Sequence, residues 1–509
     1  METGKIMSNT MRCLITGVIS IVTFALIVSG ASDIPETPRT LVVPDEYKSI
    51  SEAVAKARSG DTVFVKDGIY NEQIHLKNDI KLVGDGRDKV TIRYKIHSDH
   101  VIFADHTSGL IKDLTVEQIH EGKPNEKAVC IFILDSSVNV VGCRVRNSAG
   151  VGIVVKGKGD CVVQDCIVES NGYSGITVFG KGAAPMIKDN IVRFNRQYGI
   201  CFYDGAGGKA KGNTCQENEI GIGVMNTGAS VILKGNHCRA NRRYGISFWK
   251  GGNGLAEDNV CQKNSVMGIS VKQSGTNAVL VNNHCVENLD DGIQFYNGCT
   301  GVVEGNICEG NEDNGIVVST TKEAVIVKSN KCRGNYGRGI VLTKTEDVKV
   351  EENFCSENGK SGISVWGRGT IASLKDNVCS GNDTYGIGIS SGAKVTAKNN
   401  LCENNDWPGI QVNSKGTLVS LENNRCRGNN HSGIQFDKNS GGRAIGNVCE
   451  NNPWSGIAVR GKGTKPVLSG NKCNNNGAWG IIHWAGAEPS IGKDNVTLGN
   501  SRGGIKARD

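Results

Sequence analysis

The stretch NHCVENLDDGIQFYNG, residues 283–298, brings two adjacent carboxylates together with a cysteine, a histidine and a tyrosine. The carboxylates are Asp290 and Asp291, and Asp313 follows in the similar setting NEDNG. Carboxyl groups on either side of a glycosidic bond can serve as acid and as base or nucleophile in its hydrolysis. The same residues also suit a solvated turn before a glycine, so both interpretations stay open at this point.

Cationic residues in the same region indicate a second possible chemistry. A lyase or epimerase that acts on a uronate needs a cation to neutralise the carboxylate and a base to remove the α proton. Arg243 or Arg338 would supply the cation, and Lys272 or Tyr296 the base. We expect neither a cofactor nor a bound metal, because the cysteines and histidines lack the spacings typical of metal ligands.

Aromatic residues recur at the fourth position after a repeated glycine, where a strand would point its side chains outward. An aligned row of exposed rings is unusual and suits the apolar faces of sugars. We therefore expect a polysaccharide-binding strip, unless loops or a neighbouring coil cover the rings. The candidates are Tyr203, Trp249, Tyr296 and Trp366, with Tyr198 and Tyr244 in the preceding turns.

A short repeat must position all these residues. Cysteines recur from Cys215 to Cys473 at intervals of 23 or 24 residues, each in the pattern N-x-C-x-x-N, and a Gly-Ile pair follows. Valine takes the place of cysteine at Val145, Val168 and Val192. Since valine neither binds metal nor forms disulfides, the position requires a small buried apolar group, and a free cysteine meets that requirement.

The repeat predicts an all-β solenoid. Apolar and polar residues alternate in GISFW and GIQFY, which is the pattern of strands, and a repeat this short indicates stacked coils. Each repeat would form one coil of a single-stranded parallel β-helix, with Ile, Val or Phe, and Cys inside. The asparagines would lie at turns, adopt the left-handed backbone conformation and bond the amide of the next coil.

The chain divides into a leader and one domain. Lys5 and Arg12 precede an apolar stretch that ends in small residues, which predicts a signal peptide over residues 1–31. We expect one β-helix domain over residues 32–509, with an N-terminal cap at 40–60, irregular first coils at 61–140 and regular coils at 141–509. The cap would be an amphipathic helix, because Ile50, Ala53, Val54 and Ala57 share one helical face.

The segments SGDTVFVKDGIYNEQIHL and IKLVGDG, followed by the N-x-C-x-x-N and Gly-Ile units, resemble right-handed parallel β-helix proteins of the pectin-lyase-like superfamily. The resemblance covers residues 40–508. It implies the right-handed β-helix fold and repeats of the carbohydrate-binding and sugar-hydrolase type.

Composition and charge narrow the function further. The formal charge is +7, without the runs of lysine and arginine that mark nucleic-acid-binding arms. We expect a secreted, periplasmic or cell-surface protein that binds, and in one version processes, a polysaccharide, anionic ones included. We expect no nucleic-acid partner and no membrane contact beyond the signal segment. A polysaccharide lyase, C5-epimerase or glycoside hydrolase is one alternative, and a structural rod, adhesin or periplasmic accessory protein is another. The sequence leaves the oligomeric state open.

Overall fold

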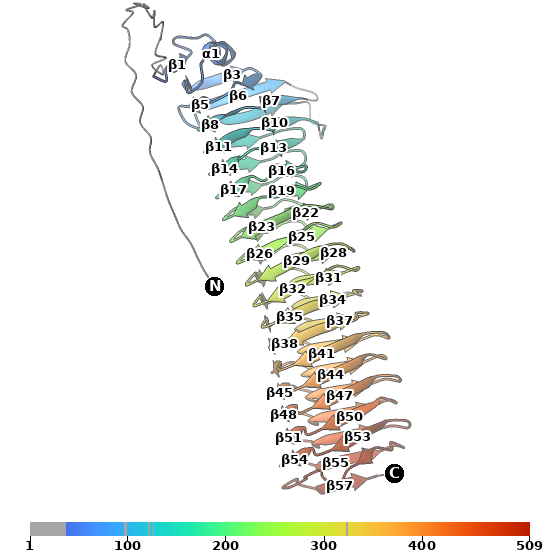
Figure 1. Cartoon of the computed structure of the whole chain (residues 1–509). Coiled ribbons are helices and arrows are strands. Elements are labelled where there is room, and N and C mark those ends of the chain that lie inside the picture. The colour runs from blue at the N-terminus through green and yellow to red at the C-terminus, as the bar shows by residue number, and fades with distance from the viewer. Residues whose placement is uncertain (1–36, 96–98, 121–122, 126, 322–323, 509) are drawn as a thin grey trace, which may run out of the picture. The chain divides into compact units, whose positions relative to one another are not determined.

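The computed structural model describes residues 37–95, 99–120, 123–125, 127–321 and 324–508 (Figure 1). From Pro38 onward the chain forms one compact unit, a right-handed parallel β-solenoid, which confirms the predicted fold class. The predicted signal peptide, residues 1–31, lies outside the described residues. Within the described residues, no helix has the length and apolar character that crossing a membrane requires.

Three parallel sheets, which we call A, B and C, receive one strand each from every coil between β2 and β55. Sheet A consists of β1 (Thr40–Val43), β2 (Thr62–Val65), β5 (Ile80–Gly84), β8 (Ser108–Lys112), β11 (Ser137–Val141), β14 (Val162–Gln164), β17 (Met186–Lys188), β20 (Lys209–Lys211), β23 (Ser230–Lys234), β26 (Asn253–Glu257), β29 (Asn277–Val281), β32 (Thr300–Glu304), β35 (Val325–Lys328), β38 (Val348–Glu351), β41 (Ile371–Lys375), β44 (Lys394–Lys398), β47 (Leu418–Glu422), β50 (Gly441–Ile445), β53 (Lys465–Ser469) and β56 (Ser490–Ile491).

The other two sheets complete each coil. Sheet B consists of β3 (Gly68–Asn71), β6 (Val90–Lys95), β9 (Thr115–Ile119), β12 (Arg144–Arg146), β15 (Ile167–Glu169), β18 (Ile191–Arg193), β21 (Thr214–Gln216), β24 (His237–Arg239), β27 (Val260–Gln262), β30 (His284–Val286), β33 (Ile307–Glu309), β36 (Lys331–Arg333), β39 (Phe354–Ser356), β42 (Val378–Ser380), β45 (Leu401–Glu403), β48 (Arg425–Arg427), β51 (Val448–Glu450) and β54 (Lys472–Asn474). Sheet C consists of β4 (Ile74–Leu76), β7 (His100–Asp105), β10 (Val129–Leu134), β13 (Val151–Lys156), β16 (Ile176–Phe179), β19 (Tyr198–Tyr203), β22 (Ile220–Met225), β25 (Tyr244–Trp249), β28 (Ile269–Lys272), β31 (Ile293–Tyr296), β34 (Ile316–Ser319), β37 (Ile340–Thr343), β40 (Ile363–Trp366), β43 (Ile387–Ser390), β46 (Ile410–Asn413), β49 (Ile434–Asp437), β52 (Ile457–Arg460), β55 (Trp479–Trp484) and β57 (Gly503–Ala507).

The predicted N-terminal helix is present as α1 (Ile50–Lys56). The side chain of Ser49 accepts a hydrogen bond from the backbone N–H of Glu52, which satisfies one of the free donors at the helix start. Ile50, Ala53 and Val54 are buried, and the helix lies against β1, β2 and β4. The helix thus covers the apolar interior where the first coils begin.

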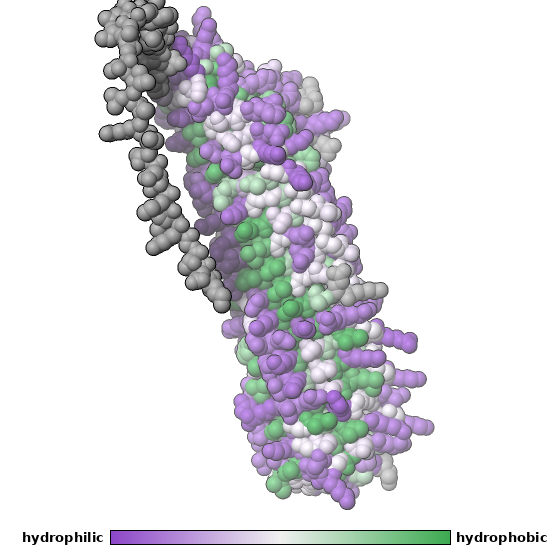
Figure 2. Space-filling view, in the orientation of Figure 1, coloured by the Kyte–Doolittle hydropathy of each residue, from purple (hydrophilic) through white to green (hydrophobic). Residues whose placement is uncertain are grey.

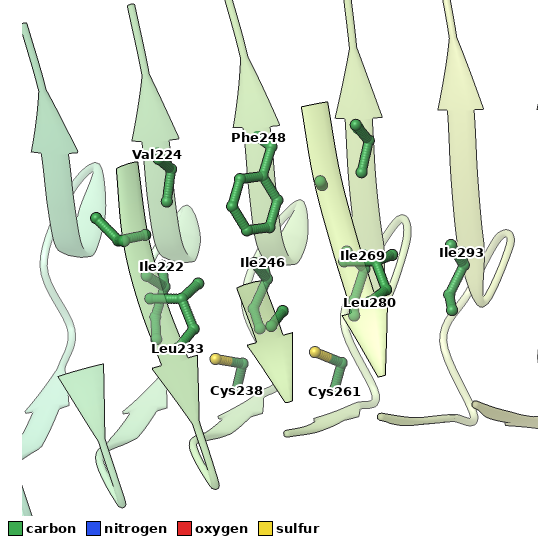
Figure 3. Packing of buried hydrophobic residues seen from close by; sticks show 14 of the residues in the cluster. Ile222, Val224, Leu233, Cys238, Ile246, Phe248, Cys261, Ile269, Leu280 and Ile293 are labelled. Carbon is green, nitrogen blue, oxygen red and sulfur yellow. The ribbon is translucent and has the colours of Figure 1, made fainter. Parts of the chain in front are cut away.

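Apolar side chains from all three sheets fill the solenoid (Figure 3). Sheet C contributes Ile246 and Phe248, sheet A contributes Leu233, and sheet B contributes Cys238, whose register partner in the next coil is Cys261. All eighteen cysteines among the described residues are buried and free. The prediction that the cysteines pack in the core is therefore confirmed.

Two rows of buried asparagines run along the solenoid, one at each end of the sheet B strands. Asn288 shows the pattern: its Nδ2 donates to Oδ1 of Asn311 at 2.9 Å and to the carbonyl of Cys261 at 3.0 Å. Its backbone N–H donates to the same Oδ1 at 3.1 Å. One amide therefore joins three successive coils, and the predicted bonding between asparagines of neighbouring coils is confirmed.

We expected these asparagines to adopt the left-handed backbone conformation, but they do not. It lies one residue earlier: Glu287, before Asn288, has φ of 52°, and Asn282, before Asn283, has φ of 53°. The preceding residue makes the corner between two sheets and can turn its side chain to solvent. The ladder asparagine must keep its amide and its N–H aligned with the next coil, so it cannot also make the corner.

The glycine of each Gly-Ile pair is required by close approach between coils. A Cβ on Gly292 would lie 2.7 Å from the carbonyl oxygen of Gly315 and 3.0 Å from Cβ of Cys308 and Nδ2 of Asn311. These are the glycine, cysteine and asparagine of the next repeat. The three invariant residue types of the repeat are therefore in mutual contact, which explains why they recur together.

The outer surface is mostly polar, with apolar patches over the middle coils of the face in Figure 2. One outward column of sheet A is aliphatic over five coils, through Ile232, Leu255, Val279, Val302 and Ile326. This column has no group for acid–base chemistry. The charged and aromatic residues of interest lie instead on the outer face of sheet C.

The asparagine row yields a stability prediction with an adjacent control. Asn429 is fully buried and its amide bonds Asn452 and the carbonyl of Cys402, whereas the neighbouring Asn430 is exposed. Asn429→Ala leaves buried donors and acceptors unpaired and should lower the free energy of unfolding by at least about 2 kcal/mol. Asn430→Ala should change it by less than about 0.5 kcal/mol. Urea denaturation midpoints measure both, and equal effects would contradict the role of the row.

Candidate functional site

The outer face of sheet C carries the residues that the sequence singled out. Strand register aligns the outward column that was predicted to be rich in aromatic residues. Its members, in coil order, are Phe179, Tyr203, Met225, Trp249, Lys272, Tyr296, Ser319, Thr343 and Trp366. Residues from the turn before each strand lie beside this column, and between them the floor is small or polar, as at Ser364 and Gln411.

The first hollow on this face, which we call the tyrosine pocket, has a volume of about 300 Å³. Cζ of Arg243 and Nζ of Lys272 each lie 5.0 Å from the ring centroid of Tyr244, a distance at which cation and ring attract. Nζ of Lys272 also lies 5.3 Å from the ring of Trp249. The pocket is lined by Gln197, Tyr198, Glu219, Ile220, Arg243, Tyr244, Ser247, Trp249 and Lys272.

The two cations of the tyrosine pocket differ in their partners. Arg243 donates to the hydroxyl of Tyr244 at 3.2 Å and lies 3.5 Å from a carboxylate oxygen of Glu219. Lys272 has no ion-pair partner among the described residues. A partly buried ammonium that lies over two aromatic rings without a paired carboxylate can bind an anion.

The remaining tyrosines sit at the margin of this pocket. Tyr296 is half-buried beside Tyr244 and Ser270, and burial raises its pKa to about 12. Burial also raises the pKa of Tyr198. Both phenols are therefore protonated at neutral pH, which makes Tyr296 a weak candidate for a base. Tyr203 stacks on Phe179, with 4.8 Å between ring centroids, and does not line the pocket.

The carboxylate cluster, Asp290, Asp291 and Asp313, lies in the turns before β31 and β34, directly beyond the tyrosine pocket. Oxygen atoms of the three side chains lie within 4.8 Å of one another. Asp290 and Asp313 are partly exposed, whereas Asp291 is only 2% exposed. The sequence correctly predicted that the three carboxylates lie close together, but it did not show which of them is buried.

Asp291 is held by three N–H donors. Its Oδ1 accepts from the backbone N–H of Asn314 at 3.0 Å and from Nδ2 of Asn314 at 2.9 Å, and its Oδ2 accepts from Nε2 of Gln294 at 2.9 Å. Burial raises the pKa of Asp291 to about 7. Burial and the nearby Asp313 raise the pKa of Asp290. Asp290 and Asp313 can thus meet a ligand, and Asp291 supports them from below.

Three neighbouring carboxylates also raise the question of a metal ion. Calcium takes six to eight oxygen ligands, and magnesium about six. Both oxygens of Asp291 already accept hydrogen bonds, so Asp290 and Asp313 are the two carboxylates left free in the cluster. Two carboxylates beside amide N–H donors make a poor cation site, and the absence of a metal stays a prediction.

The second hollow, which we call the arginine pocket, has a volume of about 220 Å³. Cζ of Arg338 lies 4.9 Å from the ring centroid of Trp366. The Arg338 side chain has no ion-pair partner among the described residues, although Asp313 is near enough to raise its pKa against the lowering effect of burial. The pocket is lined by Arg338, Lys360, Ser361, Ser364, Trp366, Thr384, Tyr385, Gly388, Ile389, Ser390, Gln411 and Asn413.

Most of the predicted residues fall into these three places, whereas Tyr203 and Tyr296 line neither pocket. Arg243, Lys272, Tyr198, Tyr244 and Trp249 form one pocket, and Arg338 joins Trp366 in another. Four coil steps, or about 19 Å, separate Tyr244 from Arg338, with the carboxylate cluster between them. The spacing of the repeat does not show that Gln294 and Asn314 hold Asp291. Alignment of the residue directly after each Gly-Ile pair shows the small or amide floor, as at Gln294, Ser364 and Gln411.

Comparisons with known proteins agree with this architecture. Residues 129–276, 224–377 and 368–505 match the family model of the right handed beta helix region. No curated protein matches the chain. Similar solved structures include the periplasmic alginate epimerase AlgG, 13% identical over 70% of this chain and 78% of that one, with a TM-score of 0.39. The N-terminal fragment of bacteriophage Phi29 gene product 12 is 12% identical over 89% of each chain, with a TM-score of 0.49. The GH87 alpha-1,3-glucanase from Streptomyces thermodiastaticus is 16% identical over 78% of this chain and 70% of that one, with a TM-score of 0.38.

The buried Asp291 yields a pH prediction. Its pKa is about 7 in the folded protein against an ordinary 3.8, so the folded state retains a proton that the unfolded state releases between about pH 4 and 7. Stability from this group therefore falls as pH rises through that window and is constant above it. Asp291→Asn lacks the titration, so its stability relative to the unmodified protein should improve by on the order of a few kcal/mol between pH 4.5 and 8.

Urea denaturation at pH 4.5, 6 and 8 measures this difference. Glu312→Gln, in the exposed turn of the next coil, is the control and should track the unmodified protein at all three pH values. If the Asp291→Asn curve also runs parallel to that of the unmodified protein, the raised pKa is wrong.

Proposed function

This chain belongs to the right-handed β-helix family, and from that premise we propose that it binds an anionic polysaccharide along the outer face of sheet C. The observation that carries the proposal is the half-buried guanidinium of Arg338, which lies over Trp366 in the arginine pocket without an ion-pair partner among the described residues. A charge removed from water costs free energy unless it is paired. A carboxylate or sulfate of a bound sugar would supply the missing partner.

The surroundings of Arg338 suit a sugar more than a simple anion. Lys360 adds a second cation, Trp366 and Tyr385 offer apolar ring surface, and hydroxyl and amide groups line the rest of the pocket. Hydroxyl-bearing ligands need such mixed polar and aromatic walls for orientation and affinity. The tyrosine pocket has the same combination of a cation and an aromatic ring, in Lys272 and Trp249. Two acidic sugars of one polysaccharide chain would therefore bind on either side of the carboxylate cluster.

The proposal places the protein outside the cytoplasm. The predicted signal peptide over residues 1–31 supports export. An exported protein can reach the polysaccharides of the cell envelope and its surroundings. A structural rod or adhesin would have the same fold and the same export. It would have no need of unpaired cations in two pockets on one face.

Removal of the two unpaired cations tests the binding proposal. Arg338→Gln and Lys272→Gln should each weaken binding of alginate or polygalacturonate at least tenfold, because each removes one charge that faces the ligand. Lys349→Gln removes a charge from the outer face of sheet A and should leave the affinity unchanged. Affinity electrophoresis and calorimetry at several salt concentrations give the values, and affinity should fall with salt. If no anionic polysaccharide binds, or if all three variants bind equally, the proposal fails.

Hydrolysis of a bound chain is a second candidate function, favoured by the carboxylate cluster. Asp290, with its raised pKa, would act as the acid, and Asp313 as the nucleophile or base. Their oxygens lie within 4.8 Å, closer to the about 5 Å of retaining glycosidases than to the 6.5–9.5 Å of inverting ones. Asp291 would position both without contacting the sugar.

Product analysis with carboxylate variants tests this second candidate. Asp290→Asn and Asp313→Asn should each reduce the formation of reducing ends from a bound anionic polysaccharide at least a hundredfold, and Glu312→Gln should not. Unsaturated products would instead indicate a lyase, for which Lys272 is the available base and Arg243 or Arg338 the neutralising cation. Binding without any product would leave a polysaccharide-binding protein.

A further inference from the structure

A stack of three rings follows the arginine pocket along sheet C. Trp407, His431 and Trp454 occupy the same turn position in successive coils. Ring centroids of Trp407 and His431 lie 6.2 Å apart with 13° between the planes, and those of His431 and Trp454 lie 4.3 Å apart with 16°. The two tryptophans are 51% and 53% exposed. Exposed aromatic surface of this kind marks places where other molecules bind, and the two indoles differ in how much of it a ligand can reach.

The two tryptophans differ in the faces they leave open. Trp407 has the ring of Tyr385 edge-on at 6.2 Å on one side and His431 on the other. His431 covers one face of Trp454, and the corresponding residue of the next coil is Ala478, whose N–H donates to the carbonyl of Trp454 at 2.8 Å. A methyl group cannot cover an indole, so one face of Trp454 is free for an apolar ring surface.

Three polar atoms beside this stack have no hydrogen-bond partner in the part of the chain that the structure describes: Nδ1 of His431, Oγ of Ser432 and Oε1 of Gln435. All three come from one coil, and Ser432 is only 1% exposed. Buried polar groups almost always find partners, and an unpaired one destabilises the protein. This coil therefore contains a row of groups whose partners a bound molecule would supply.

These three groups suit a ligand without charge. The serine hydroxyl and the glutamine carbonyl carry no charge, and burial lowers the pKa of His431, which keeps its imidazole neutral at neutral pH. The nearest carboxylates already have partners: Asp406 accepts from Nδ2 of Asn430, and Asp437 accepts from the backbone N–H of Lys438. Hydroxyl groups complement all three unpaired atoms without any need for a carboxylate or sulfate.

We propose that Trp454, His431, Ser432 and Gln435 form a second subsite, which binds a neutral sugar residue. The sugar lays its C–H face on the open face of Trp454 above Ala478. The hydroxyls of the sugar reach past the edge of the exposed indole toward the polar groups of the preceding coil, His431, Ser432 and Gln435. The subsite rests on the proposed function and adds that the polysaccharide contains neutral residues as well as acidic ones.

Neutral oligosaccharides test the subsite separately from the cationic pockets. The hexaoses of cellulose, xylan, mannan and laminarin are the probes, measured by calorimetry and by tryptophan fluorescence in 0.5 M NaCl, where charge contributes little. At least one should bind and change the fluorescence of Trp454. Trp454→Ala, Gln435→Leu and Ala478→Phe should each weaken its binding at least tenfold, since they remove the ring, remove the acceptor or fill the open face. Trp407→Ala, whose ring has neighbours on both sides, should stay within twofold of the unmodified protein.

The outcomes separate the two proposals. Binding of polygalacturonate or alginate without binding of any neutral hexaose overturns the subsite and leaves the anionic polysaccharide proposal standing. Neutral binding that survives both Trp454→Ala and Gln435→Leu also overturns the subsite. Neutral binding without any anionic binding supports the subsite and overturns the role of the cationic pockets.

Discussion

Hydrogen bonds between buried asparagine amides fix the height of each coil on the next, and the remaining structure depends on them. Asn288 bonds the coil above through Asn311 and the coil below through the carbonyl of Cys261. A strand that slipped by one residue would break these bonds and turn its apolar side chains outward. Because the amides prevent slippage, a column of residues stays in register over the coils that the asparagine rows join, from Asn171 to Asn500.

That fixed register turns the outer faces into surfaces on which each position can vary independently. The interior requires glycine, cysteine or valine, and asparagine at set positions, whereas the exposed turn residues beside sheet C vary from coil to coil. Three distinct chemistries can therefore follow one another along a single face: cations on aromatic rings, paired carboxylates, and a stacked indole beside neutral polar groups. In a globular protein these groups would have to share one pocket.

Charge pairing distinguishes this face from its neighbour. On sheet B, arginines pair with acids one coil away: Arg193 lies 2.8 Å from Glu169, and Arg427 lies 2.7 Å from Glu403. Such exposed pairs contribute little to stability, but they show that a surface cation with an acid nearby forms an ion pair. Lys272 and Arg338 on sheet C lie over aromatic rings without such a partner among the described residues. These two cations, each over an aromatic ring, are the reason for our proposal that sheet C binds another molecule.

The repeat could be predicted from the sequence, because each of its recurring residue types makes a contact that is the same from coil to coil. The spacing of N-x-C-x-x-N and Gly-Ile determined the solenoid, the inward cysteines, the amide rows and the alignment of Trp249, Lys272 and Tyr296. It did not place the left-handed residue before each asparagine, since the spacing cannot show which of two adjacent residues makes the corner. Only the tertiary structure decided that Asp291 is buried under Asn314 and Gln294 while Asp290 and Asp313 stay accessible, and that Arg243 and Lys272 share the ring of Tyr244 while Arg338 lies elsewhere. These side chains belong to different coils, and they meet only after the coils have stacked.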